Sequence, residues 1–375
     1  MERMTMSNLQ TPFRYDFVGS FLRPEKLKKA RRQFNEGKID AAALKKVEDE
    51  AITELVSKIK ELGYHVITDG EFRRATWHLD FMWGFDGIGH TPTKTGLPFH
   101  GEAAMVDDTY IVGKIGLTGE HPFVDHFRFV KALEDENTVA KQTIPSPAQF
   151  LAQFTMPFNR GCTEKHYPNE QELVNDIVAA YGKVIDDLYA AGCRNLQLDD
   201  CTWGMFADKI GHTLYGTTRE GIVEFQKAHK DINNKVIANA PKDMIINTHV
   251  CRGNFHSTYA SEGAYDSVAD ILFGEENVNA YFLEFDDERS GGFAPLAKVS
   301  GEKKVVLGLI TTKSMVIAIQ TPMTPSPRPC PKIYAMPTRQ SHMEAIATIM
   351  VNLTSPAARS ALDCAKDNGC TSIQH

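Results

Sequence analysis

The sequence predicts an α/β fold, a (β/α)8-type barrel of parallel strands built as a single domain. Short apolar runs, typical of strands, alternate along the chain with long amphipathic stretches, typical of helices, and this order favours a parallel sheet. The length of 375 residues suits one such barrel with insertions. The first strand is followed by VGSFLRP, which lacks the glycine-rich phosphate loop of a doubly wound open sheet, so the barrel is favoured.

The first part of the chain supplies three predicted strands. YDFVGS reads as a strand that ends at Ser20, and Pro24 then opens a helix, as proline does in a first turn. From Asp40 to Gly63 the apolar residues recur at helical spacing, and glycine is a common C-terminal cap. HVITDGE predicts the second strand and VAKQTIPSP the third. Residues 77–135 between them are rich in glycine and aromatic residues, so we expect an insertion over one end of the barrel.

The second part supplies four more strands. NEQELVNDIVAAYGKVIDDLYAAG predicts a helix ended by Gly192, and NLQLDD predicts the fourth strand. REGIVEFQKAHKDIN predicts the next helix. MIINTHVC, NAYFLEFDD and KKVVLGLI predict the fifth, sixth and seventh strands.

The tail, residues 314–375, does not continue this pattern, so the closure of the barrel is left open. Prolines are too dense between Met315 and Pro337 for the expected crossover helix. SHMEAIATIMVNL predicts a late helix, and the eighth strand has no clear candidate. A barrel without it exposes two sheet edges, so the tail must supply a substitute strand, recruit another chain or leave the barrel open.

Composition excludes some classes of function. The formal net charge of −7 argues against binding to nucleic acid, whose phosphates require a clustered basic surface. No window approaches the run of apolar residues that a membrane span needs, and the N-terminal segment has no apolar signal core, so we expect a cytoplasmic protein without a membrane partner. The seven cysteines are scattered and odd in number, which favours free thiols or metal ligands over a disulfide framework.

The predicted strand ends gather polar and titratable side chains, where barrels carry their functional residues. These residues are Ser20, Glu71, Asp199, Asp200, His249, Cys251, Glu284, Asp286 and Asp287.

Three of them have the chemistry of a zinc site. His249 and Cys251 lie two apart on one strand, so their side chains point the same way and can reach one ion at about 2.0 and 2.3 Å. Glu284 ends the next strand, about 4.8 Å away. Nitrogen, sulfur and oxygen ligands together suit zinc better than magnesium or calcium. The alternative is a core histidine beside a buried thiol, with Glu284 in a solvated acidic loop.

Carboxylates at the same rim suit a substrate ammonium group. Glu71 and Asp199 are the candidates, and the alternative for them is a structural salt bridge with Arg73 or Arg74. Ser20 can hold a substrate carboxylate near the free amides at the start of the first helix, or act only as a cap.

Two other features have weaker functional interpretations. The aromatic segment WHLDFMWGFDG either forms a ring-stacking wall for a ligand or packs in the core. Cys193 and Cys201 read as inert core thiols.

Five motifs, in order, resemble the catalytic half of cobalamin-independent methionine synthase, and more closely the short bacterial relatives with a single barrel. They are VGSFLRPEKL, VITDGEFRR, LQLDD, THVCRGNF and LEFDDERSGGFAPL, spread between about Tyr15 and Lys313. The resemblance implies the barrel of the methionine synthase and uroporphyrinogen decarboxylase superfamily. It also implies a zinc-bound homocysteine thiolate that receives a methyl group. The residues it assigns are His249, Cys251 and Glu284 for zinc, and Ser20, Glu71 and Asp199 for homocysteine.

The sequence departs from that family in two places. The family's fourth zinc ligand is a cysteine in a Ser-Pro-x-Cys-Gly-like motif, which is absent here; Cys330 in SPRPC is nearest, with Cys364 and Cys370 further along. LGLITTKS stands where the full-length enzyme has a catalytic histidine in a D-I-H-S motif, so no catalytic residue is assigned. The methyl donor is then a methylated folate or another carrier such as a corrinoid.

The leading hypothesis is therefore a zinc-dependent methyltransferase acting on homocysteine or a related thiol. One alternative is a catalytically impaired thiol-binding barrel that has lost its last metal ligand. The other is a decarboxylase of the uroporphyrinogen type, whose chemistry requires arginines that grip acetate groups.

Overall fold

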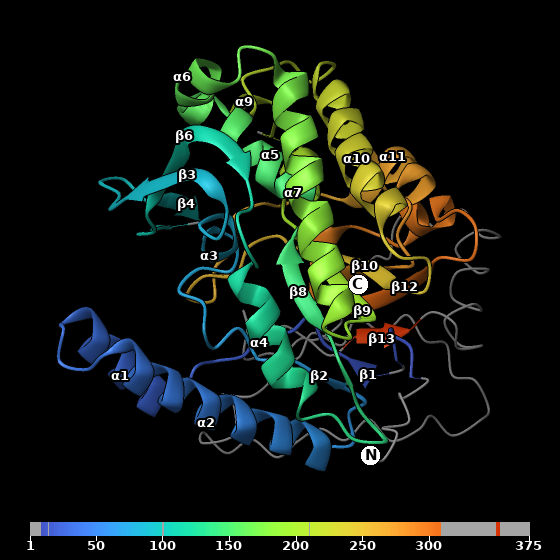
Figure 1. Cartoon of the computed structure of the whole chain (residues 1–375). Coiled ribbons are helices and arrows are strands. Elements are labelled where there is room, and N and C mark those ends of the chain that lie inside the picture. Colours follow the sequence, from blue (N-terminus) through green and yellow to red (C-terminus); the bar gives the residue numbers. More distant parts are fainter. Residues whose placement is uncertain (1–8, 14, 100, 210, 309–349, 353–375) are drawn as a thin grey trace, which may run out of the picture.

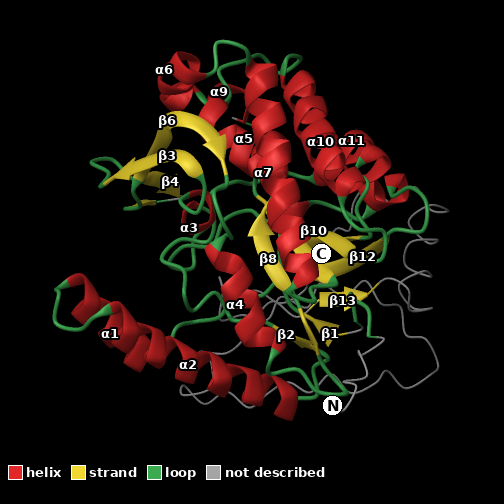
Figure 2. Cartoon of the chain, viewed as in Figure 1, coloured by secondary structure: helices red, strands yellow, loops and turns green. Residues whose placement is uncertain are grey.

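The computed structural model describes residues 9–13, 15–99, 101–209, 211–308 and 350–352, and every structural statement below concerns these residues. They form an α/β fold in which helices cover the outside of a mainly parallel sheet (Figures 1 and 2). The predicted α/β class with a parallel sheet is thus confirmed.

The main sheet has seven strands. Their order is β1 (Tyr15–Asp16), β13 (Met350–Asn352), β12 (Lys304–Gly308), β11 (Ala280–Glu284), β10 (Ile245–Val250), β9 (Asn195–Asp200) and β8 (Gln142–Pro145). The strands from β8 to β12 are parallel, as the sequence predicts. The runs NLQLDD, MIINTHVC, NAYFLEFDD and KKVVLGLI all contain the strands expected of them.

A second, two-stranded parallel sheet extends the first one. β2 (Val66–Ile67) pairs with β7 (Val139–Ala140), and only Lys141 separates β7 from β8. Between β1 and β2 the described chain has no strand ladder, although the Phe21 backbone N–H bonds the Gly70 carbonyl at 3.1 Å. In the described chain the main sheet and the β2–β7 pair are therefore separate ladders, without continuous hydrogen bonding between β1 and β2.

The tail supplies a substitute strand, the first of the three alternatives, within a segment for which the sequence predicts a helix. β13 lies between β1 and β12 and is antiparallel to both, with Val351 opposite Tyr15 and Leu307 (Figure 1). The helix predicted over residues 341–353 is therefore wrong at its C-terminal end. Residues 309–349 and 353–375 lie outside the described residues, including the proline-rich stretch and Cys330, Cys364 and Cys370.

The four helices predicted before the tail are present as α1, α2, α7 and α10, and side chains cap two of them. Asp40 accepts a hydrogen bond from the Ala43 backbone N–H at 2.8 Å, and Asn169 caps α7 in the same way. The helices outside residues 77–135 are α1 (Glu25–Asn35), α2 (Ala41–Glu61), α5 (Pro147–Thr155), α6 (Pro157–His166), α7 (Glu170–Ala190), α8 (Thr202–Ala207), α9 (Gly211–Leu214), α10 (Ile222–Asn239) and α11 (Ala269–Glu275), with 3-10 turns η1 (Tyr265–Ser267), η2 (Glu288–Ser290) and η3 (Ala294–Lys298).

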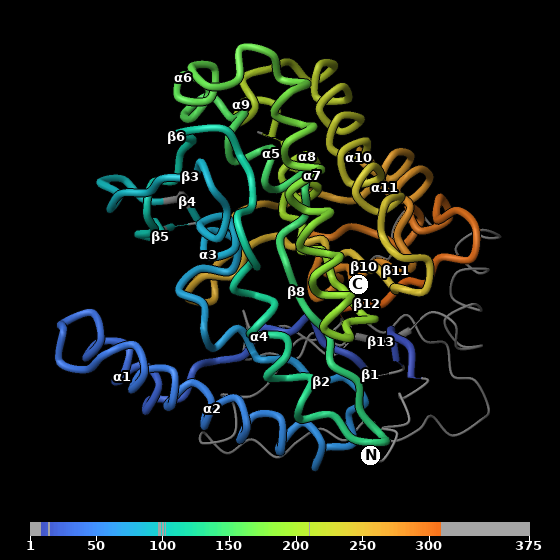
Figure 3. Tube along the Cα trace, viewed as in Figure 1, coloured from blue at the N-terminus to red at the C-terminus, as the bar shows by residue number. Residues whose placement is uncertain are grey.

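Residues 77–135 lie between β2 and β7 and hold more regular structure than the predicted insertion. They comprise α3 (Leu79–Met82), β3 (Asp86–Thr91), β4 (Leu97–Phe99), β5 (Glu102–Ala104), β6 (Asp108–Gly116) and α4 (Pro122–Lys131). Figure 3 shows β3 to β6 gathered on one side of the molecule beside α6. α4 packs against β7 and α7. This segment therefore also contains the crossover helix that precedes β7 and β8, where the third strand is predicted.

The strands enclose a polar core. The Lys141 ammonium lies 3.1 Å from an Asp16 oxygen and 3.0 Å from the Gln197 side-chain oxygen, and the side chains of the ion pair are fully buried. Outside the strands, apolar side chains from the sheet and helices form the main hydrophobic core. No described helix combines the length and apolar character that crossing a membrane requires.

Candidate metal centre

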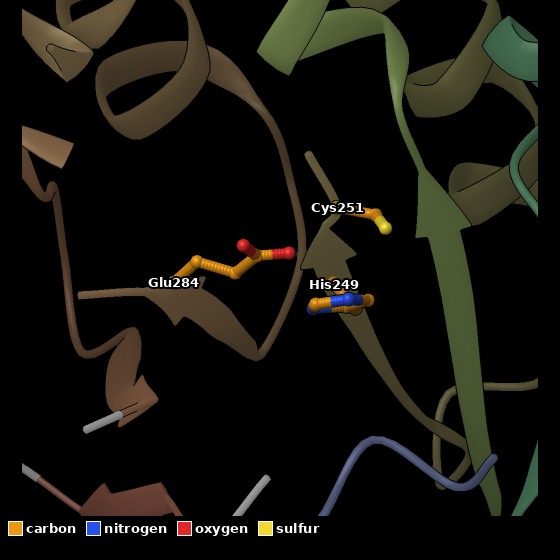
Figure 4. Close-up of side chains that lie close together, drawn as sticks. All are labelled: His249, Cys251 and Glu284. Carbon is orange, nitrogen blue, oxygen red and sulfur yellow. The ribbon is translucent and has the colours of Figure 1, made fainter. Parts of the chain in front are cut away.

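The ladder between β10 and β11 brings the three predicted zinc ligands together. His249 pairs with Phe282 and Val250 pairs with Leu283, so Cys251 and Glu284 follow at the same level. One potential ligand atom from each of His249, Cys251 and Glu284 lies within 4.8 Å of the others (Figure 4). All three lie at the carboxyl ends of β10 and β11, the end at which parallel barrels carry their functional sites; this end of the sheet is called the mouth below.

The backbone fixes the orientation of the His249 ring. Its Nδ1 lies 3.1 Å from the Phe282 carbonyl oxygen, which can only accept a hydrogen bond, so Nδ1 carries the proton. In the neutral ring, which is the form that binds a metal, Nε2 is then the nitrogen with a lone pair available to an ion. Such a hydrogen bond from the second ring nitrogen is the usual support of a metal-bound histidine.

The Cys251 sulfur is stabilised as a thiolate. Hydrogen bonds from the side chains of Cys201 and His249 hold the pKa of Cys251 well below its usual value, although burial acts in the opposite direction. The Gly253 backbone N–H also points to this sulfur at 3.2 Å. Burial lowers the pKa of His249, but the hydrogen bond to Cys251 and nearby negative charges outweigh it and raise the pKa to about 9. The thiolate is the form that binds metals.

Glu284 is held by the chain segment that carries Cys251. Its Oε1 accepts a hydrogen bond from the Arg252 backbone N–H at 3.0 Å, which turns the carboxylate toward the neighbouring strand end. Nitrogen, sulfur and oxygen donors in one buried cluster fit a zinc ion. The donor set thus agrees with the metal that the sequence predicts.

Asp199 is the second buried acid at this mouth. It lies opposite His249 in the ladder between β9 and β10, and it accepts a hydrogen bond from the Gln197 amide at 2.7 Å. The pKa of Asp199 is raised to about 7, mainly by burial; the charge of His249 opposes this shift and the charge of Glu71 adds to it. A cation placed between two such carboxylates would favour their charged forms.

Glu71 lies on the turn after β2 in a strained conformation. Its φ is +59°, which non-glycine residues rarely adopt, and such strain is common at functional sites. Burial is the main cause that raises the pKa of Glu71. The Arg74 guanidinium lies 3.3 Å from its Oε1, so the salt bridge considered as an alternative does exist. Arg73 pairs instead with Glu48 at 3.3 Å and with Asp49.

The other acids near the strand ends have structural partners. Asp200 faces the helices, where it accepts hydrogen bonds from Ser146 at 2.7 Å and from the Thr202 backbone N–H at 2.8 Å. Asp287 bonds the Arg289 guanidinium at 2.6 Å. Of the adjacent pair at the end of β9, only Asp199 therefore faces the candidate centre.

Ser20 is exposed in the loop between β1 and α1. The helix begins at Glu25, so its free amides are not at Ser20 itself. The loop is nevertheless held against the turn that carries Glu71, because the Thr68 hydroxyl bonds the Gly19 carbonyl at 3.0 Å. The structure thus places Ser20 at the same rim as the buried acids.

The structure also describes rings of the aromatic segment and the thiols of Cys193 and Cys201. Phe81 and Phe85 are buried and pack edge-on against each other, which confirms the core interpretation for these two rings. Cys193 is buried, and burial raises its pKa to about 12, as expected of an inert thiol. The pKa of Cys201, also expected to be an inert thiol, is raised as well, by its interaction with Cys251 and by burial.

Comparison with known proteins gives relatives over most of the chain, while no family model matches. The Bacillus subtilis protein YxjG, which is uncharacterized, is 39% identical over 318 residues, 83% of this chain and 81% of its own length. The methionine synthase of Saccharolobus solfataricus is 25% identical over 258 residues, 67% of each chain.

Two solved structures are similar. A Listeria monocytogenes protein, provisionally named vitamin-B12 independent methionine synthase, is 35% identical with a TM-score of 0.63, over 82% of this chain and 83% of its own. A B12-independent methionine synthase from Shewanella, solved with selenomethionine, is 17% identical with a TM-score of 0.53, over 73% of each chain, and its likeness concerns the fold. The chain therefore belongs to the family of YxjG and of this Listeria protein, which is related to the cobalamin-independent methionine synthases.

Proposed function

We propose that this chain is a zinc-dependent methyltransferase that transfers a methyl group to the thiol of homocysteine or of a related compound. The observation that carries the proposal is the cluster of His249, Cys251 and Glu284, whose ligand atoms lie within 4.8 Å of one another. Relatives named as methionine synthases support the reaction class. We further propose a single barrel domain over residues 1–375, with a family-like (β/α)8 barrel at 15–313 whose sheet β13 of the tail joins, an insertion at 77–135, and a cytoplasmic location.

The metal would lower the pKa of a substrate thiol bound to it. A free thiol has a pKa near 8.5, so little of it is thiolate at neutral pH, and coordination to zinc removes its proton. His249, Cys251 and Glu284 would hold the ion, with the Phe282 carbonyl and the Arg252 amide orienting two of these ligands. The chain thereby supplies a fixed place for the substrate sulfur.

The buried acids would bind the substrate head group. Glu71 and Asp199 both have raised pKa values because burial disfavours their charges, and an ammonium group between them would relieve that cost. Ser20, on the loop held against the Glu71 turn, would receive the substrate carboxylate. Fixing both ends of an amino acid orients its sulfur toward the methyl donor. A bound selenomethionine in the Shewanella protein accords with an amino acid ligand of this shape.

The test is methyl transfer by zinc-loaded protein. The acceptors are homocysteine and a simple alkyl thiol without the amino acid head, and the donors are methyltetrahydrofolate, its triglutamate and methylcobalamin. We expect methionine from homocysteine with at least one donor, little product from the simple thiol, and none with Cys251→Ser. Binding of zinc and homocysteine without turnover by any donor would favour the impaired, thiol-binding barrel instead.

A further inference from the structure

Three side chains share one level at the mouth, on the ends of three consecutive strands. Asp200 pairs with Val250 and Val250 pairs with Leu283. The next residue on each strand is Cys201, Cys251 and Glu284 respectively. The Cys251 backbone N–H bonds the Asp200 carbonyl at 3.1 Å, which continues the ladder to this level. Cys251 thus has Glu284 on one side and Cys201 on the other.

The backbones of the two cysteines are held close together by their surroundings. The Cys201 backbone N–H donates to the Gln149 side-chain oxygen at 3.2 Å, immediately before α8 begins. Gly204 of α8 packs so closely that an added Cβ would lie 2.7 Å from the Cys251 carbonyl oxygen. Interaction between the two side chains lowers the pKa of Cys251 and raises that of Cys201, and both cysteines are partly exposed.

We propose that Cys201 is a second sulfur ligand of the metal centre, which would then comprise two sulfurs, one nitrogen and one oxygen. The inference rests on the metal centre proposed above. Cys201 adjoins the cluster through Cys251, and ligation requires its side chain to rotate about the Cα–Cβ bond toward the ion. Its thiol proton would be released to solvent, since only the thiolate binds zinc. Four protein ligands of this kind form a tetrahedral zinc site, so a substrate thiolate would add as a fifth ligand or take the place of one of them.

The first measurement counts sulfur ligands by X-ray absorption at the zinc edge. Wild-type protein should show two sulfurs, Cys201→Ala should show one, and the buried Cys193→Ser should still show two. In competition with a chelator, Cys201→Ala should bind zinc at least about tenfold more weakly than wild type. One sulfur in the wild type, or two in Cys201→Ala, would overturn the inference.

The second measurement needs no variant. Iodoacetamide labelling of wild-type protein, read by mass spectrometry, should show that zinc protects both Cys201 and Cys251. Cys162, which is partly exposed on α6, is the internal control and should react equally with and without zinc. Protection of Cys251 alone would show that Cys201 is not a ligand.

These outcomes separate the two proposals. Zinc bound through a single cysteine sulfur leaves the proposed methyltransferase intact and removes only Cys201 from the centre. Failure of the wild-type chain to bind zinc at all would remove both.

Discussion

Asp199 on β9 lies directly opposite His249 on β10 in the parallel ladder. A residue proposed to bind the substrate ammonium group is therefore held at a fixed place beside a proposed metal ligand. Both residues lie on strands and not on loops. Their fixed positions would keep the substrate head group and the reacting sulfur in a constant relative orientation.

Asp199→Asn should weaken homocysteine binding and leave zinc binding unchanged. Loss of one charged partner to a buried ammonium group typically costs about 3–5 kcal/mol. Calorimetry with homocysteine and metal analysis of the same sample give the two readings. The control is Asp107→Asn on the inserted segment, which should change neither homocysteine binding nor zinc binding. Normal homocysteine binding by Asp199→Asn would show that Asp199 is not part of the substrate site.

Glu71→Gln should weaken homocysteine binding and also lower the free energy of unfolding, measured in urea without substrate. Glu71 is the carboxylate beside the buried Arg74 guanidinium, so its loss leaves that cation uncompensated, at a cost of about 3–5 kcal/mol. Asp199→Asn should not lower stability, because burial already disfavours the charge of Asp199. Lower stability with unaltered homocysteine binding would leave Glu71 only its structural role.

Val351→Pro should destabilise the fold. Val351 lies in β13 between Tyr15 of β1 and Leu307 of β12, and a proline there removes a ladder hydrogen bond in the middle of a sheet. Urea unfolding should show a loss of about 3 kcal/mol or more, whereas Val351→Thr, which keeps a β-branched side chain, should cost much less. Equal stability of the two variants would mean that β13 does not support the sheet.

Acid should destabilise the protein through its buried histidines, and His229 is the clearest case. His229 is 1% exposed and packs against Phe206, and burial lowers its pKa to about 3. In the unfolded chain the pKa is about 6.5, so below that pH the unfolded chain binds more protons. The stabilising contribution is therefore complete above about pH 6.5 and is lost as the pH falls toward 3.

His229→Gln should flatten this dependence, measured as the urea unfolding free energy between pH 4 and pH 7. The exposed His65→Gln is the matched control and should follow the wild type. An unchanged slope in His229→Gln would mean that His229 carries no part of the acid sensitivity.

Much of the fold could be predicted because the strands and long helices show strong periodicity and local caps. α5 and α6 were not predicted, and Pro147 was assigned to the third strand; Pro147 and Pro157 both stand at the first helical position, where proline fits. β13 was missed because SHMEAIATIMVNL is compatible with a helix by its spacing. Pairing with β1 and β12, distant in sequence, decides its conformation.

Strand alternation predicts which residues of the site share a face of the sheet. It does not predict which of the two faces points toward the site. His249 and Cys251 share a face because they are two residues apart, a relation that needs no structure. Asp199 and Asp200 are adjacent, so only the register shows that Asp199 faces the mouth while Asp200 bonds Ser146. The same alternation, counted from Asp199, places Cys201 on the inner face. The sequence thus contains this indication, which the interpretation of Cys201 as an inert thiol does not use.

The zinc content of His249→Ala and Cys251→Ser tests the account most directly. Wild-type protein loaded with zinc and freed of excess metal should retain about one ion per chain. Both variants should lose tight binding, whereas His65→Ala, an exposed histidine far along the sequence from the centre, should retain the ion. Full retention in both His249→Ala and Cys251→Ser, with folding confirmed by circular dichroism, would contradict a metal centre built on these residues.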